Sequence, residues 1–98
     1  MEHESALVFA AGHPAFGGHF PGVPIVPGVL LLDAAVHAAQ QAGASVSGVA
    51  SAKFLHPVAP EEALTLRVTG GADGRVRFEI RSGAQAAASG QLVTGVKA

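Results

Sequence analysis

One histidine and one aspartate stand out in this sequence as a candidate pair for proton transfer. His19 lies in the glycine- and proline-rich run GGHFPG, and Asp33 follows it fourteen residues later as the only acid between Phe20 and Val36. An unperturbed imidazole titrates near pH ~6.5, so a neutral His19 can accept a proton at physiological pH. A carboxylic acid in apolar surroundings stays protonated and can donate one. The two residues predict a catalytic site, against the simpler readings of a loop-bracing histidine and a paired or solvated helix acid.

A helix must position Asp33. Pro27 suits the first turn of a helix, the residues 29–42 contain no glycine or proline, and Gly43 is a natural stop. Apolar residues occur nearly all the way round this segment, which predicts a buried helix with Asp33 in an apolar setting. The first N–H groups of a helix have no intrahelical partner, so Gly28 could present them to a substrate oxygen; it could also be required for the turn alone.

Two separate motifs resemble the 3-hydroxyacyl-[acyl-carrier-protein] dehydratases. The first is HFPGVPIVPGVLLLD, from His19 to Asp33, and the second is KFLHPVAPEE, from Lys53 to Glu62, which is similar to the family pattern K-F-x-x-P-V-x-P-x-D. The two motifs occur in the expected order over about half of the chain. The short segment before the first motif is more similar to paralogues from aryl polyene and other pigment pathways than to housekeeping members.

The resemblance implies a fold, a reaction and a site. The fold is the hot-dog fold of the α+β class, an antiparallel sheet wrapped around one central helix. The reaction is dehydration of a 3-hydroxyacyl group on acyl carrier protein, with no cofactor. His19 would act as the base, Asp33 as the acid and Gly28 as the oxyanion site, with Phe20 and Pro27 binding substrate. The family also implies paired subunits, each site taking His19 from one chain and Asp33 from the other.

His37 departs from the family pattern, because many members carry glutamine one turn after the acid. It shares a helix face with Asp33 at a spacing of four residues and is a candidate substrate-binding residue that could tune the acid. The alternative is a histidine satisfied in the core or at an interface.

The rest of the chain predicts strands within a single domain, residues 1–98. We expect them at 5–11, at 46–58 with a bulge at Gly48, around the alternating residues 64–69 and 75–81, and at 84–96. Val76, Phe78 and Ile80 point to one face of the sheet and the neighbouring arginines to the other.

Composition excludes several classes of function. A net charge of −1 with six Lys and Arg argues against a nucleic-acid surface. The absence of cysteine excludes disulfides and thiolate zinc sites, and the spacing of the histidines predicts no metal. With no apolar run near the ~20 residues of a membrane span and no basic start of a signal peptide, we expect a cytoplasmic protein that does not enter a membrane.

Four arginines fall in the carboxyl half: Arg67, Arg75, Arg77 and Arg81. They could steer an acidic carrier protein, or they could be solvated residues on a strand face. Two other functions also remain open. A hot-dog thioesterase would use Asp33, or a water that it activates, to attack the thioester. A non-catalytic subunit would bind the acyl group without turnover.

Overall fold

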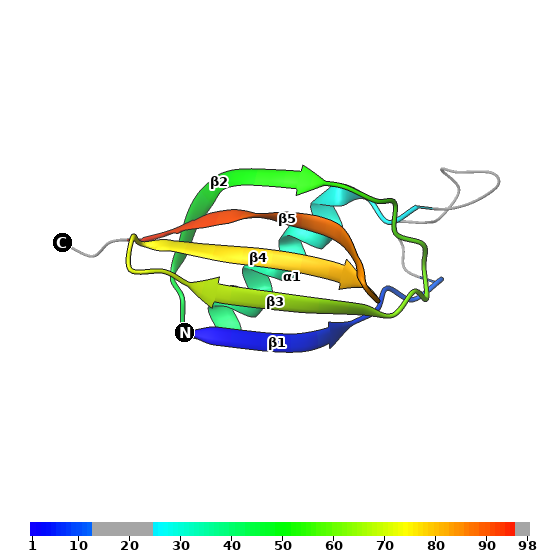
Figure 1. Cartoon of the computed structure of the whole chain (residues 1–98), viewed down its shortest axis with the longest axis horizontal. Helices are drawn as coiled ribbons and strands as arrows, with labels where there is room; N and C mark the ends of the chain where they lie inside the picture. The colour runs from blue at the N-terminus through cyan, green and yellow to red at the C-terminus, as the bar shows by residue number, and fades with distance from the viewer. Residues whose placement is uncertain (13–24, 96–98) are drawn as a thin grey trace.

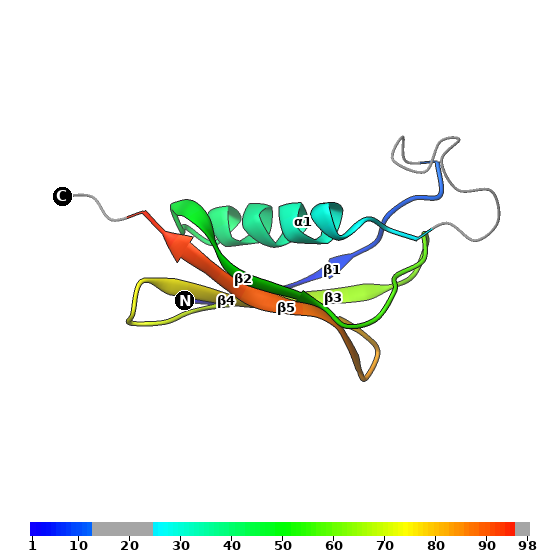
Figure 2. The same ribbon diagram turned by 90° about the horizontal axis from the view of Figure 1, so that it is seen from above.

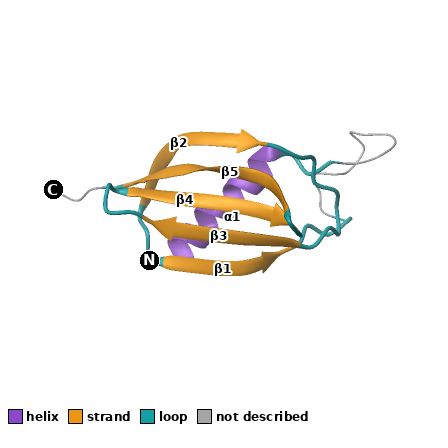
Figure 3. Cartoon of the chain, viewed as in Figure 1, coloured by secondary structure: helices purple, strands orange, loops and turns teal. Residues whose placement is uncertain are grey.

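A computed structural model describes residues 1–12 and 25–95 of the chain. Five strands form one sheet in the order β1-β3-β4-β5-β2, with every neighbouring pair antiparallel (Figure 1, Figure 3). One helix lies across a single face of this sheet, as the side view in Figure 2 shows. The hot-dog arrangement expected from the sequence is confirmed. The elements are β1 (Glu2–Leu7), α1 (Gly28–Gln41), β2 (Val46–Phe54), β3 (Leu64–Gly70), β4 (Arg75–Ser82) and β5 (Gln85–Thr94).

The helix α1 begins and ends close to the residues that the sequence predicts. Pro27 precedes it with φ −60° and ψ 143°, the extended conformation of an N-cap. At the other end, Gly43 adopts φ 102°, a region that favours glycine. Its N–H donates to the Gln40 carbonyl at 3.0 Å, and the Ala44 N–H donates to the Ala39 carbonyl at 2.9 Å. This pair of bonds is a Schellman motif, which satisfies carbonyl groups at the end of the helix.

Within the single chain, the predicted burial of α1 holds for the face toward the sheet and is wrong for the opposite face. Leu31, Ala35, Ala38 and Ala39 are its buried residues, and they face the sheet. Its opposite side is exposed and carries Val29, Asp33, His37 and Gln40. Apolar side chains all round a helix do not by themselves supply a second layer, and within one chain the sheet covers only one side of α1.

The core lies between α1 and the inner face of the sheet. Every second residue of the central strands is buried there, and the intervening residues are more exposed on the opposite face, which we call the outer face. The alternation predicted for β3 and β4 is therefore confirmed. The inner-face residues of these two strands are Leu64, Leu66, Val68, Val76, Phe78 and Ile80.

The ends of three strands differ from the predicted ones. β1 lies earlier, because its ladder with β3 runs from the pair Glu2 and Thr69 to the pair Leu7 and Leu64. β2 contains a register shift at the expected bulge near Gly48, but it ends at Phe54 and not at 58. The N–H groups of the next two residues, 55 and 56, both donate to one carbonyl of β5, and a proline without an N–H follows them. β5 begins one residue later than predicted and ends at Thr94; the predicted end at residue 96 lies outside the described residues.

Candidate active site

The predicted site residues divide into those that the structure describes and those outside its described ranges. His19 and Phe20 fall within residues 13–24 and so lie outside the described residues. Pro27, Gly28, Asp33 and His37 all belong to α1 or its N-cap and are described.

The amino-terminal end of α1 opens into a cavity. Gly28 lines a space of about 340 Å³ together with neighbours on the helix and on the chain that leaves β2. Pro27 gives no side-chain cap, and the first turn of the helix contains no acidic residue. The Leu30 N–H donates to the Pro27 carbonyl at 3.0 Å, so within the described residues it is the N–H groups of Gly28 and Val29 that keep their capacity to donate. The helix dipole adds partial positive charge at the same point. The other lining residues are Ile25, Val26, Leu31, Phe54, Leu55, His56, Pro57 and Val58.

The cavity walls are mostly apolar, and they leave apolar surface exposed. Ile25, Phe54 and Leu55 are about half exposed although they are large hydrophobic residues. An apolar space with a few directed N–H groups suits a ligand that has a hydrophobic body and one polar atom to be held. A carbonyl oxygen that gains negative charge during a reaction would be stabilised at such a helix end.

Phe54 gives a second reason for a glycine at position 28, which the sequence analysis missed. A Cβ atom built on Gly28 would lie 3.0 to 3.2 Å from three carbons of the Phe54 ring. Contacts this short are tighter than normal van der Waals packing. The glycine therefore gives room to this aromatic ring as well as to any ligand. Phe54 belongs to the second sequence motif, where it follows Lys53. Nothing in the sequence indicates that this motif lies beside the start of the helix.

Asp33 does not lie in the apolar, buried setting predicted for it. It is exposed on the side of α1 that faces away from the sheet. It lies about 7.5 Å along the helix axis from Gly28, at ~1.5 Å per residue. The cause is the one-sided cover of the helix: Asp33 lies opposite the residues that face the sheet. Shielding Asp33 from water would require a further surface over the side of α1 that faces away from the sheet.

His37 lies one turn beyond Asp33 on the same exposed side. It also lines a groove of about 390 Å³ between the helix and β1, where His3, Ser5 and Gln41 contribute polar atoms. Within the single chain, His37 is therefore not satisfied in the core. Of the predicted site residues that the structure describes, Gly28 lines the cavity, whereas Pro27, Asp33 and His37 lie outside its walls.

The four arginines of the carboxyl half lie on the outer face of the sheet or at its margin. Arg67 pairs with Glu2, and this carboxylate raises the pKa of Arg67 through a hydrogen bond and its charge. Arg81 pairs with Glu79 at 2.9 Å. These partners favour the reading of solvated strand-face residues over that of a free basic patch for this pair.

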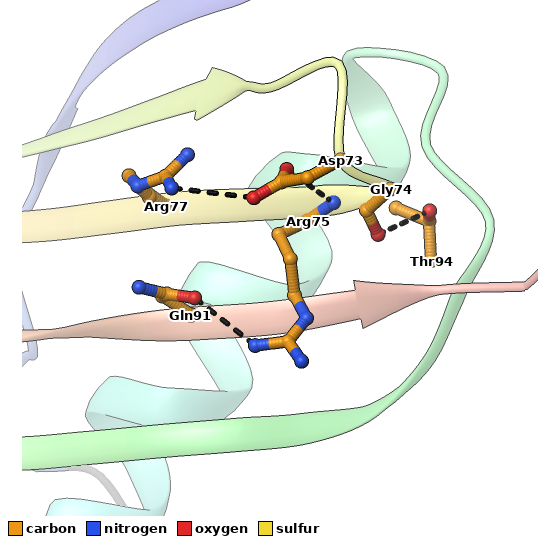
Figure 4. Close-up of polar contacts among 6 residues, drawn as sticks. All are labelled: Asp73, Gly74, Arg75, Arg77, Gln91 and Thr94. Carbon is orange, nitrogen blue, oxygen red and sulfur yellow. Dashed lines mark hydrogen bonds and ion pairs between the residues drawn. The ribbon is translucent and has the colours of Figure 1, made fainter.

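The other two arginines lie toward the β3–β4 turn (Figure 4). Arg75 donates to the side-chain oxygen of Gln91 at 3.1 Å, and Arg77 approaches Asp73 at 3.4 Å. The Arg75 N–H, and then the charge of Arg77, lower the pKa of Asp73. Arg75 has no carboxylate within salt-bridge distance among residues 1–12 and 25–95.

Two further features concern the described part of the chain only. Its one helix, α1, is not long and apolar enough to cross a membrane. No group of three or more potential metal-ligating side chains occurs within these ranges.

Comparison with known proteins gives a consistent family. The sequence matches the ApeI-like family, described as ApeI dehydratase, over residues 1–91. A 3-hydroxyacyl-[acyl-carrier-protein] dehydratase FabZ from Chlamydia trachomatis is 36% identical over 95 residues, which cover 81% of this chain and 62% of that protein. The FabZ of Thermus thermophilus is 44% identical over 64 residues, 54% of this chain and 45% of that protein. The chain thus spans less than two thirds of the length of these curated relatives.

A solved structure agrees over nearly the whole chain. A chain of the dehydratase heterocomplex ApeI:P from Xenorhabdus doucetiae is similar with a TM-score of 0.84 and 28% sequence identity. The similarity covers 97% of this chain and 88% of that one.

Proposed function

The chain belongs to the ApeI-like dehydratase family, and we propose that it dehydrates a 3-hydroxyacyl thioester carried by acyl carrier protein. In this reaction, a proton leaves the carbon next to the thioester carbonyl and the hydroxyl leaves the following carbon as water. A trans double bond forms between the two carbons. The relatives named 3-hydroxyacyl-[acyl-carrier-protein] dehydratase support this substrate class.

The observation that carries the proposal is the uncapped start of α1 at an apolar cavity. Gly28 and its neighbours offer N–H groups to the thioester oxygen, where negative charge develops once the proton has left. The apolar walls suit the acyl chain. His19 takes the proton, and Asp33 gives one to the departing hydroxyl, directly or through a water.

The exposed position of Asp33 supports a site that is completed by a second subunit. We propose a homodimer in which each site takes His19 from one chain and Asp33 from the other. Val29, on the same side of α1 as Asp33, is 68% exposed, which leaves apolar surface for a partner to cover. β2 is an edge strand of the described sheet and is also free to pair. A subunit interface over the exposed side of α1 would exclude water from Asp33, as its proposed role as the acid requires.

Mass spectrometry of carrier-bound substrates tests the reaction. A panel of aliphatic and aryl 3-hydroxyacyl groups on acyl carrier protein is incubated with the protein, and we expect the loss of one water from at least one member. Release of free thiol would indicate the thioesterase instead. Binding of the carrier-bound group without any mass change would indicate a non-catalytic subunit, and either result would reject the dehydratase.

A further inference from the structure

Glu61 adopts a backbone conformation that is costly for its residue type. Its φ is 68°, and it is the only non-glycine residue with positive φ within residues 1–12 and 25–95. Glycine takes this left-handed region at little cost, whereas a side chain with a Cβ atom does not. Such a residue persists where the surrounding contacts determine its conformation, and it is a reason to look for a function of the side chain.

The contacts of Glu61 are with the chain that follows β1. Its N–H donates to the Phe9 carbonyl at 2.7 Å, and its carboxylate accepts the Ala11 N–H at 2.7 Å. A carboxylate acceptor makes the second bond stronger than a neutral one would be. Glu61 takes part in none of the ion pairs found among the described residues. The bond to Ala11 is therefore the contact that a glycine at position 61 could not make.

The same connection also holds the chain on the other side of residues 13–24. The Val58 carbonyl accepts the Val26 N–H at 2.8 Å. We call residues 58–62 the anchor. Ala11 precedes residues 13–24 and Val26 follows them, so the anchor binds both flanks of the segment in which His19 occurs.

The anchor is itself fixed to the sheet. The Glu62 carboxylate accepts the Ala59 N–H at 2.9 Å and the hydroxyl of Ser82, the last residue of β4. Val58 is 1% exposed and belongs to the core cluster. The anchor is therefore attached both to the core and to β4, and it holds Ala11 and Val26 in fixed positions relative to the sheet.

We propose that Glu61 is a positioning residue for the reaction: its carboxylate holds Ala11, which precedes residues 13–24, and the geometry of His19 depends on this attachment. The inference rests on the proposed function, in which His19 removes the proton. A base contributes its full effect only when it is held close to the right geometry, and a displacement of about 1 Å costs up to ~10²-fold in rate. The need to position His19 would explain why a glutamate occupies position 61 although its positive φ is unfavourable for this residue type.

Three variants separate positioning from stability. Glu61→Gly removes the carboxylate but keeps the N–H that binds Phe9 and eases the backbone. Glu61→Gln keeps a side-chain oxygen of the same reach. Glu4→Gln removes an exposed acid from β1 and serves as the charge control. Each protein is studied by amide hydrogen exchange, by NMR of the His19 imidazole, by thermal unfolding, and by kcat and KM on a carrier-bound substrate.

We expect Glu61→Gly to speed Ala11 amide exchange about 10-fold, to shift the His19 resonances and to lower kcat about 10-fold or more, with KM changed by less than about 3-fold. Its Tm should stay the same or rise. Glu61→Gln and Glu4→Gln should keep the wild-type His19 resonances and kcat within about 3-fold. A Glu61→Gly protein with wild-type Ala11 exchange, wild-type His19 resonances or wild-type kcat overturns the proposal. So does a loss of kcat that only follows a fall in Tm.

Failure of the proposed function gives a different pattern. A wild-type protein that turns over no 3-hydroxyacyl substrate rejects the dehydratase reaction. The exchange of Ala11 and the resonances of His19 then still decide whether Glu61 holds the segment, since neither requires activity.

Discussion

At the scale of single residues, the proposed base and acid allow the sharpest prediction. His19→Ala and Asp33→Asn should each lower kcat by roughly 10²- to 10⁴-fold, the usual contribution of a general acid or base. Asp33 is exposed in the single chain, so its substitution should leave the fold intact, with an unchanged circular dichroism spectrum. His37→Gln, which supplies the residue of many relatives, should keep most of the activity. Wild-type turnover by the His19→Ala protein would remove this mechanism.

Gly28 and Phe54 form a second residue-scale test, because they are in contact. Gly28→Val should lower kcat more than it weakens binding, since its side chain would enter the space at the helix start and displace the Phe54 ring. Removing the ring separates two causes. If only the crowded ring matters, the double variant Gly28→Val, Phe54→Ala recovers the activity that Gly28→Val alone loses. If the oxygen site needs the bare backbone, the double variant stays slow. An effect on Tm alone would contradict the oxyanion role of Gly28.

At the scale of elements, the sequence predicts most of the fold from local signals. Pro27 and Gly43 bound the helix, and the alternation around Phe78 gives the two faces of the sheet. The burial of α1 could not be predicted from its composition, because burial depends on what covers the helix. The placement of Asp33 failed for the same reason. The approach of Phe54 to Gly28 joins two distant motifs, and it is the packing of α1 against β2 that brings them together.

The hydrogen bond between Glu62, in the β2–β3 connection, and Ser82 of β4 predicts that stability depends on pH. The Ser82 hydroxyl, and then the Ala59 N–H, lower the pKa of Glu62 below the ordinary glutamate value of 4.5. A lowered folded-state pKa stabilises the fold above the unfolded-state pKa, and this contribution is lost as the pH falls through the folded-state value. Glu62→Gln should therefore reduce stability at pH 7 and flatten the loss of stability below about pH 4.5. Urea unfolding at several pH values measures the free energy of unfolding of the wild type and of Glu62→Gln. If this free energy changes with pH in the same way in the two proteins, the hydrogen bonds assigned to Glu62 are contradicted.

At the scale of the whole molecule, the described part of one chain does not bring Asp33 into the cavity at the start of α1. The cavity at Gly28 and the exposed Asp33 belong to one helix, yet Asp33 is outside the cavity walls. Exposed apolar residues lie beside both of them. A two-fold dimer would cover these surfaces and create two equivalent sites at once.

Mixing two inactive proteins tests the shared site most directly. His19→Ala and Asp33→Asn chains are purified separately, combined under conditions that exchange subunits, and tested on a carrier-bound 3-hydroxyacyl substrate. Each mixed dimer should contain one intact site and one doubly damaged site, so activity should appear on mixing and approach half of the wild-type value per mixed dimer. Each variant alone is the control. No recovery after proven exchange, or a fully active wild-type monomer in sedimentation, would contradict the account.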